Sequence, residues 1–250
     1  MHSDIQLHLK QRRQWVSNYD LKLEIFKNFY QTPRLGMDMS DGGGAFGFDI
    51  HHALEACYLI HHYNCDAILE TGTNSGDTTE FLAKMFPSLP ILTCEIQQKY
   101  VDVANIRLKG YDNVKVFLQS SEKFLAQYAN KYDFPFVFLD AHWNDYWPLH
   151  DELNIIKSGV VCVDDCDIGD IGFGYDAYNG IVCNPEMISK AVSDNLMFPE
   201  DQVKVFTNNP HSEYTYPCMQ KDRRGGRGYY VLGKDTDIIE QNDNFKLNEV

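Results

Sequence analysis

The chain has 250 residues, of which 44% are hydrophobic, and this suits one α/β domain with a small appendage. Its formal net charge of −14 makes DNA or RNA a poor default substrate, because the field repels nucleic acid over most of the surface. No apolar run approaches the roughly 20 residues of a membrane span, and no signal peptide is evident. Seven scattered cysteines without a CxxC pair indicate a reduced, cytoplasmic protein.

The first fifty residues are predicted to be an appendage to the core. Residues 1–31 carry an apolar face typical of a helix, and the glycine-rich stretch 41–47 follows. A helix predicted over about 49–63 then leads into the core. We therefore divide the chain into 1–50, an N-terminal helix and glycine-rich loop, and 51–250, the core domain. The glycine-rich stretch is either a lid over the site or an ordinary surface loop.

From Asp66 onward, short apolar runs alternate with helical stretches. Five such runs predict strands at 67–69, 91–94, 114–117, 136–139 and 160–163. Strict alternation implies a parallel sheet covered by helices on both faces. Two later runs, 203–206 and 228–232, have no helix pattern between them and predict an antiparallel pair. The expected fold class is α/β, with a Rossmann-like, mostly parallel seven-stranded sheet and an antiparallel last strand. The polar tail from Asp235 is expected to fray.

The end of the first predicted strand carries the pattern E-x-G-x-x-x-G. Gly72 and Gly76 let the backbone turn sharply against a ligand, and the following helix N-terminus directs amide donors at a carboxylate. The dinucleotide fingerprint G-x-G-x-x-G is absent, which disfavours NAD and FAD. Glu70, just before the turn, favours a ligand with an ammonium group.

The next two strand ends extend this pattern. Glu95 ends the second strand, where an acid accepts hydrogen bonds from both ribose hydroxyls. The third strand ends in Ser120 and Ser121, small polar residues where an adenine edge would lie. Each signal alone also fits a solvated loop residue. Together, in order at consecutive strand ends, they predict binding of S-adenosylmethionine.

Residues from about 50 to 234 resemble class I S-adenosylmethionine-dependent methyltransferases. The run VFLDAHW at 137–143 resembles the acidic fourth-strand motif of macrocin-type sugar O-methyltransferases and of catechol O-methyltransferases. The resemblance implies the Rossmann-like class I methyltransferase fold. The cofactor-binding positions that it implies are Glu70, Gly72, Thr73, Gly76, Thr78, Glu95, Ser120, Ser121 and Asp140.

Three acids end the fourth and fifth predicted strands: Asp140, Asp164 and Asp165. Adjacent strand ends lie about 5 Å apart, so three carboxylates can converge, and their repulsion favours a divalent cation. Oxygen ligands select Mg²⁺ or Mn²⁺ over Zn²⁺. Both resembled families place metal ligands here. Asp165 replaces the Asn of the catechol enzymes, which favours the macrocin-like interpretation. Alternatively, Asp164 or Asp165 caps the following turn.

The catalytic base is expected at Asp140 or His142, and the choice stays open. A metal beside the methyl donor would bind a substrate hydroxyl and lower its pKa. Catechol enzymes place a lysine shortly after the fourth-strand motif, whereas this chain has none there. A carboxylate or a neutral histidine can take the proton instead. The remaining histidines considered are expected to be ordinary helix residues: His51, His52, His61, His62 and His150.

Candidate acceptor-side residues lie in two later segments. Tyr175 belongs to the glycine-rich stretch 167–175, which is a second candidate lid. Arg223 and Arg224 belong to a basic segment before the last strand. Arginine offers forked donors that match phosphate, so this segment predicts a phosphorylated or nucleotide-linked acceptor; the alternative is a solvated turn.

The sequence therefore predicts Mg²⁺-assisted, S-adenosylmethionine-dependent O-methylation of a small hydroxylated molecule: a sugar, a sugar nucleotide or a glycoside. One alternative is an oxidoreductase of the hydroxylase kind on the same fold, although no facial triad for iron is evident. Another is a non-catalytic adenosylmethionine-binding module, against which the intact acid set argues. The oligomeric state is open, with a homodimer as one candidate.

Overall fold

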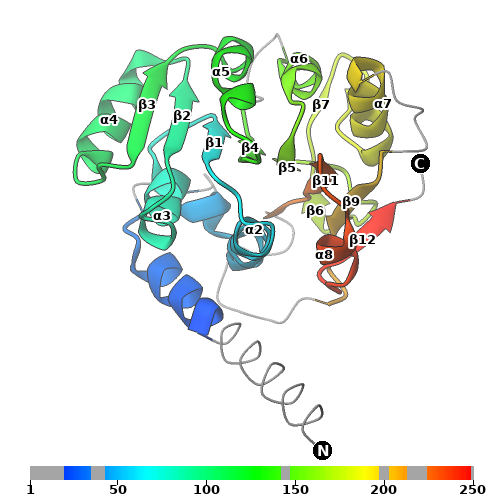
Figure 1. Cartoon of the computed structure of the whole chain (residues 1–250), viewed down its shortest axis with the longest axis horizontal. Coiled ribbons are helices and arrows are strands. Elements are labelled where there is room, and N and C mark those ends of the chain that lie inside the picture. Colours follow the sequence, from blue (N-terminus) through cyan, green and yellow to red (C-terminus); the bar gives the residue numbers. More distant parts are fainter. Residues whose placement is uncertain (1–19, 35–42, 142–146, 197–202, 213–223, 249–250) are drawn as a thin grey trace, which may run out of the picture.

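An eight-stranded sheet passes between two layers of helices (Figure 1). The computed structural model describes residues 20–34, 43–141, 147–196, 203–212 and 224–248. The strand order within the described chain is β12-β9-β11-β5-β4-β1-β2-β3. Their bounds are β1 Ile68–Thr71, β2 Ile91–Glu95, β3 Val114–Leu118, β4 Phe136–Leu139, β5 Gly159–Val163, β9 Val205–Asn208, β11 Gly228–Leu232 and β12 Phe245–Asn248.

The pairing confirms the predicted fold class. Strand β1 pairs in parallel with both β2 and β4, and β4 pairs in parallel with β5. Strand β11 pairs antiparallel with both β5 and β9, as the two helix-free runs near the C-terminus predict. A sheet that starts at β1 and winds outward in both directions, with β11 inserted antiparallel between β5 and β9, is the Rossmann-like class I methyltransferase architecture. Ligands of such sheets bind at the carboxyl ends of the strands.

Two helical layers cover the sheet. Helices α2 (Ile50–His62), α3 (Asp77–Met85) and α8 (Asp237–Glu240) pack on one face. Helices α5 (Ser121–Tyr128), α6 (Leu149–Ile155) and α7 (Pro185–Leu196) pack on the other, which is the upper side in Figure 1. Helix α4 (Gln98–Leu108) lies at the β2–β3 end, and the short 3-10 helix η3 (Ala129–Lys131) follows α5.

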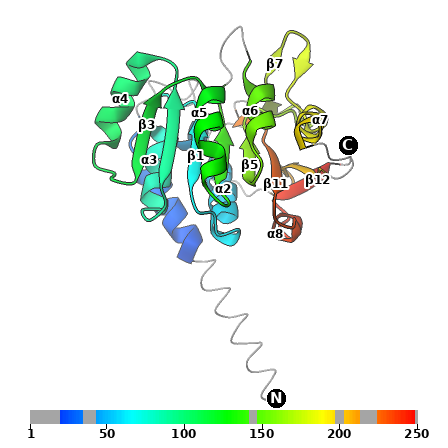
Figure 2. The same cartoon turned by 45° about the horizontal axis from the view of Figure 1, so that its top comes forward.

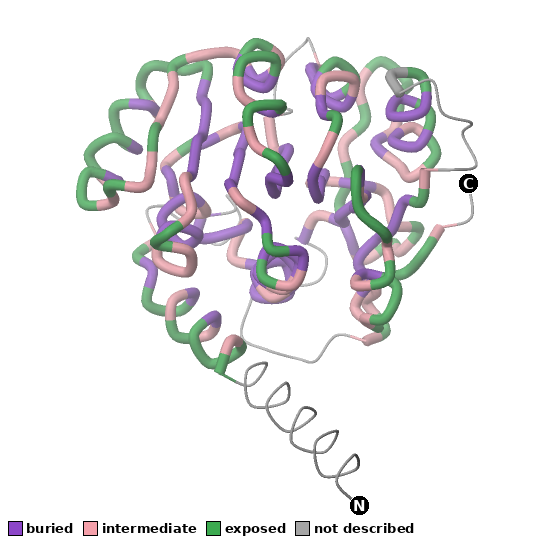
Figure 3. Tube along the Cα trace, viewed as in Figure 1, coloured by how far each residue is buried: buried purple, intermediate pink, exposed green. Residues whose placement is uncertain are grey.

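Burial explains why these segments form a sheet. Strands β1, β2, β4 and β5 are buried along their whole length, as expected for parallel strands covered on both faces (Figure 3). Alternate side chains divide between the two faces, so that Ile68 joins the cluster with α2 and Leu69 joins the cluster with α5. The edge strand β3 is less buried. The core therefore holds the central strands in place, and the candidate site residues lie at the carboxyl ends of these strands.

The tail is ordered from Asp235 to Asn248, so the predictions of a frayed tail and of seven strands are wrong for these residues. Helix α8 and strand β12 follow, and β12 pairs antiparallel with β9 as the eighth strand. Ile239 is fully buried, and the Phe245 ring lies 5.1 Å from that of Tyr229. Burial of these two side chains removes apolar surface from water and, together with the pairing of β12 on β9, holds the tail on the sheet.

The N-terminal part packs closely on the core. Residues 20–31 are helical and bury Ile25 and Phe29, whereas 1–19 lie outside the described residues. The glycine-rich stretch continues as a short 3-10 turn, η2 (Ala45–Phe48), in which Phe46 is buried. Asp49 caps α2 directly after this turn. The boundary near residue 50 between an appendage and a core domain stays a prediction.

The segment after β5 forms no helix up to α7, as its glycine content predicts. It contains β6 (Phe173–Gly174) and a small hairpin of β7 (Ala177–Tyr178) and β8 (Ile181–Val182), which projects from the body in Figure 2. Strand β10 (Arg224–Gly225) pairs in parallel with β6. Among the described residues, no helix is long and apolar enough to cross a membrane.

Candidate active site

The turn between β1 and α3 is built on two glycines in the left-handed region. Gly72 has a φ of 83° and Gly76 a φ of 78°. A Cβ on Gly72 would lie 2.2 Å from the Asp140 carbonyl oxygen, so only glycine lets the turn pass against the end of β4. Gly76 is the N-cap of α3 and supplies no side-chain cap. The first-turn amides of α3 therefore face the carboxyl edge of the sheet without a side-chain acceptor on the N-cap residue.

Glu70 lies beneath this turn and is buried. Its carboxylate accepts a hydrogen bond from the Thr79 hydroxyl of α3. Burial raises the pKa of Glu70 to about 7, although hydrogen bonds from Thr79 and Thr93 oppose the rise. An ammonium group placed near Glu70 would pull this pKa down, because an opposite charge favours the ionised carboxylate.

Glu95 ends β2 and bridges two loops. Its Oε2 accepts from the Asn74 amide at 3.0 Å and its Oε1 accepts from the Gln97 amide at 2.9 Å. An ionised carboxylate offers about four lone-pair positions, so each oxygen can still accept one ligand hydroxyl. Beside it, the Thr73 and Thr93 hydroxyls lie 2.6 Å apart, and Thr73 is buried.

The third strand end is partly closed by its own contacts. Ser120 precedes α5, and its hydroxyl donates to Glu122 at 2.6 Å, while Ser121 is buried as the first residue of the helix. Thr78, in the first turn of α3, accepts a hydrogen bond from the Phe46 amide at 2.9 Å. The glycine-rich stretch thus docks directly on the helix that follows the β1–α3 turn.

Acids gather on the neighbouring half of the edge. Desolvation and the charges of Asp164 and Asp165 raise the pKa of Asp140 well above 3.8. Asp176 also contributes, and its amide donates to the Asp165 carbonyl at 2.8 Å. The sequence did not point to Asp176 as a member of this group of acids, because Asp176 follows no strand of the main sheet. Over the described parts of the chain, no group of three or more His, Cys, Asp or Glu is placed to hold a metal ion.

The other predicted site residues have varied surroundings. Tyr175 is exposed on the segment between β6 and β7. Arg224 is buried, with its Nε 2.6 Å from Asp49 Oδ2, so the alternative of a solvated turn is wrong for this residue. His142 and Arg223 lie outside the described residues.

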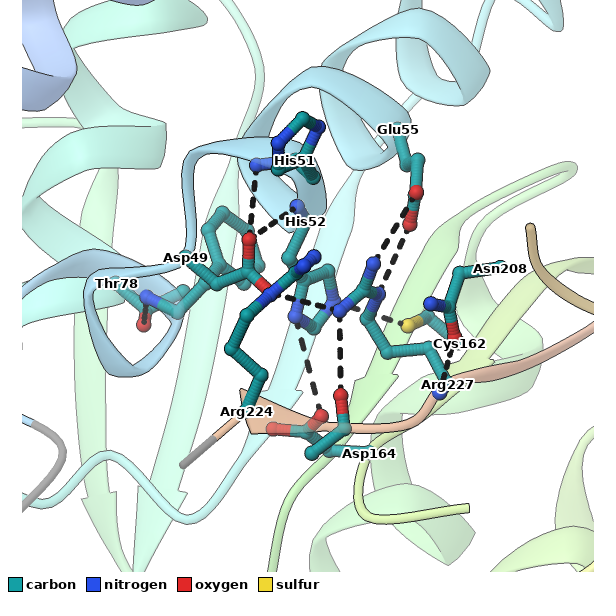
Figure 4. A network of polar contacts seen from close by, with 12 residues as sticks. Asp49, His51, His52, Glu55, Thr78, Cys162, Asp164, Asn208, Arg224 and Arg227 are labelled. Carbon is teal, nitrogen blue, oxygen red and sulfur yellow. Dashed lines mark hydrogen bonds and ion pairs between the residues drawn. The ribbon is translucent and has the colours of Figure 1, made fainter. Parts of the chain in front are cut away.

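A buried polar network adjoins the acids (Figure 4). Asp49 Oδ1 caps α2 by accepting from the His51 and His52 amides, while Oδ2 accepts from Arg224 and Arg227. Although burial opposes ionisation, the two arginines pull the pKa of Asp49 down to about 2. The carboxylate is therefore ionised throughout the physiological range, and its charge holds both guanidinium groups in place.

His52 is not an ordinary helix residue, contrary to the prediction from sequence. Its ring is buried, with Nε2 3.3 Å from Cys162 Sγ and Nδ1 3.9 Å from Asp164 Oδ1. Burial and the nearby Arg227 hold its pKa well below 6.5, so the imidazole is neutral at pH 7. The only signal in the sequence was its place in the first turn after a capping Asp49.

Comparison with known proteins gives structural likeness alone. No family model and no curated protein matches the chain. It is similar to an O-methyltransferase from Bacillus cereus in complex with SAH, at 18% identity, 85% and 90% coverage of this and that chain, and a TM-score of 0.49. The SAH-bound methyltransferase PaMTH1 from Podospora anserina is 15% identical, with 90% of this chain and 96% of that chain covered and a TM-score of 0.46. The spermidine synthase from Thermotoga maritima is 15% identical, with 76% of this chain and 62% of that chain covered and a TM-score of 0.47. Likeness this distant carries no conclusion about activity.

Proposed function

We propose that this chain is an S-adenosylmethionine-dependent O-methyltransferase acting on a small hydroxylated molecule. The geometry of the β1–α3 turn carries the proposal. Two left-handed glycines, Gly72 and Gly76, bring the start of α3 to the sheet edge between two acids, Glu70 and Glu95. When bound, the cofactor supplies an electrophilic methyl group on its sulfonium.

The residues present fit the three polar parts of this cofactor. The amides of the first turn of α3 suit the methionine carboxylate, because a helix N-terminus attracts anions. Glu70 suits the ammonium group, and the two oxygens of Glu95 suit the ribose hydroxyls. Ser120 and Ser121 border the adenine position at the end of β3.

Asp140 is our candidate for the base. Its pKa is raised by desolvation and by Asp164 and Asp165, and a raised pKa makes a carboxylate a better proton acceptor near neutral pH. Its carbonyl lies against Gly72, so the residue joins the cofactor turn to the acidic edge. His142, the second candidate, remains a proposal.

We also propose that Mg²⁺ assists the methyl transfer. Asp140, Asp164 and Asp165 are the oxygen donors that Mg²⁺ or Mn²⁺ prefers. As they stand, the described residues do not bring three such groups into a ligand set. If an ion is required, EDTA should abolish turnover and Mg²⁺ should restore it, whereas SAH affinity should not change. Undiminished turnover in EDTA would remove the metal from the proposal.

For the acceptor, a sugar, a sugar nucleotide or a glycoside remains the proposal. The charge of Arg224 is already compensated by Asp49, which favours an uncharged hydroxylated acceptor over a phosphorylated one. Tyr175, exposed between β6 and β7, is the described side chain proposed to contact the acceptor. A mixed panel of neutral sugars and sugar nucleotides, assayed for methyl transfer, separates the two acceptor classes.

Calorimetry with S-adenosylhomocysteine tests the cofactor site directly. Glu95→Ala should weaken binding by about 1.5–3 kcal/mol, the usual contribution of hydrogen bonds to a charged group. Glu186→Ala, which removes an exposed acid on α7, is the matched control and should leave the affinity unchanged. An unaltered affinity in folded Glu95→Ala, or no binding by the wild type, contradicts the proposal.

A further inference from the structure

Four charged side chains are buried together behind the acidic edge. Arg224 Nε lies 2.6 Å from Asp49 Oδ2, and Arg227 Nη1 lies 2.8 Å from the same oxygen. Arg227 Nε is 2.9 Å from Glu55 Oε2. Each side chain is at most 6% exposed. Burying charge is costly even when it is paired, so such a cluster is weak evidence for stability. Its best-attested use is to fix one arrangement of the chain.

On one side the cluster is joined to the cofactor turn. Asp49 directly follows η2, whose Phe46 amide donates to Thr78 in the first turn of α3. The Phe46 ring also lies 4.3 Å from the His52 ring. Phe46 has a φ of 52°, a conformation that costs energy for a residue with a side chain, so the surrounding contacts must hold it in place. The position of Asp49 is therefore tied to the start of α3.

On the other side the cluster is joined to the acids. Arg224 and Arg227 flank Gly225 and Gly226, and the Gly226 carbonyl accepts from the Cys166 amide at 2.8 Å. Gly225 lies so close to Asp165 that a Cβ there would be 2.2 Å from its Oδ1. The chain that the arginines anchor is thus the surface against which Asp165 rests.

A second connection runs through His52. It follows Asp49 by three residues, donates its amide to Asp49 Oδ1 at 3.4 Å, and brings its ring Nδ1 to 3.9 Å from Asp164. In Figure 4, a dashed line joins the His52 ring directly to Asp164, beside the contacts that Asp49 makes with the two arginines. The first turn of α2 therefore reaches Asp164, the first of the two acids that follow β5.

We propose that Arg224 and Asp49 are positioning residues, which couple occupancy of the β1–α3 turn to the placement of Asp164 and Asp165. The inference rests on the proposed function, because the ligand of the turn is the cofactor of that proposal. A ligand held by the first turn of α3 restrains Thr78 and with it Phe46. Asp49 is restrained in turn, and its pair with Arg224 fixes Gly225 against Asp165.

Hydrogen exchange of the full chain with and without S-adenosylhomocysteine tests this coupling without an acceptor. In the wild type, ligand should slow exchange in α3 and also in 164–176, which includes the Cys166 amide. In Arg224→Met the slowing in α3 should persist and that in 164–176 should be lost. Arg224→Lys, which keeps the charge, should restore part of it. Lys204→Met, which breaks the exposed pair with Glu240, should behave as wild type.

The outcomes are distinguishable. If the wild type binds no S-adenosylhomocysteine, the proposed function fails and the coupling fails with it. If ligand protects α3 alone in the wild type, or still protects 164–176 in Arg224→Met, the coupling is overturned and the cofactor site stands. Should Arg224→Met fail to fold, Asp49→Asn removes the same charge pair and keeps a side-chain oxygen to cap α2. The same loss of protection at 164–176 is expected there.

Discussion

The two halves of the carboxyl edge are held together in different ways. In the proposed cofactor half, at the ends of β1 to β3, Glu95 is fixed by the amides of Asn74 and Gln97, which lie 21 and 2 residues away in the chain. In the proposed acceptor half, at the ends of β4 and β5, Arg224 and Arg227 reach Asp49 across 175 and 178 residues. Glu95 is thus held by backbone amides, whereas Asp49 is held by ion pairs with a distant segment.

This difference predicts different vulnerabilities. Backbone donors survive most substitutions, so the cofactor half should tolerate changes that leave its glycines and acids intact. A buried ion pair depends on both side chains, and removing one leaves the other charged and desolvated. Single substitutions in the acceptor half should therefore act over a wider region.

The largest effect is expected for Arg227→Met. It leaves Glu55 and Asp49 without their shared guanidinium partner, which should cost about 3–5 kcal/mol of unfolding free energy. Arg107 is the counterpart in the cofactor half, with Nε 2.5 Å from Glu80. Arg107→Met should cost less, roughly 1.5–3 kcal/mol, because Glu80 keeps Lys84 at 2.8 Å. Urea denaturation measures both, and equal losses would contradict the comparison.

Two glycines sharpen the contrast. Gly72→Ala would force a Cβ against the backbone carbonyl of Asp140 at a φ of 83°, and should cost roughly 2–5 kcal/mol and abolish S-adenosylhomocysteine binding. Gly225→Ala meets the Asp165 carboxylate, which can rotate away. It should cost less in stability, leave cofactor affinity unchanged and lower turnover. The comparison is wrong if Gly225→Ala weakens cofactor binding as much as Gly72→Ala does.

Glu70 should give an effect on stability that is confined to part of the pH range. Its folded pKa of about 7 exceeds the ordinary value of 4.5, so the folded state binds the proton more tightly than the unfolded state. Stability is therefore lost as pH rises from about 4.5 to 7 and then levels off. Glu70→Gln should be more stable than wild type above pH 7, by about 3 kcal/mol at most, and no more stable below pH 4.5.

The same carboxylate provides a binding readout. S-adenosylmethionine affinity of the wild type should fall about tenfold per pH unit below 7, because protonated Glu70 no longer attracts the ammonium group. Glu70→Gln should bind more weakly and lose this dependence. Calorimetry from pH 6 to 8 checks both, and a pH-independent wild type would separate Glu70 from the cofactor.

Much of the fold was predictable from sequence because it depends on local pattern. The apolar runs ending at Glu95 and Asp140 place parallel strands, and Gly72 and Gly76 mark the turn between them. The tail was misjudged because its polar composition hid two residues, Ile239 and Phe245, whose burial depends on partners far away in the chain.

By itself, the sequence determined the order of strands and helices and the acids at the strand ends, since hydrophobic period and glycine position act within a few residues. Only the tertiary structure decided the surroundings of those acids. It brought Asp49 and His52 from the start of α2, and Arg224 and Arg227 from the end of the chain, to one buried point. No pattern within the sequence encodes such pairs, because a buried charge finds its partner by proximity in the folded chain rather than by spacing along it.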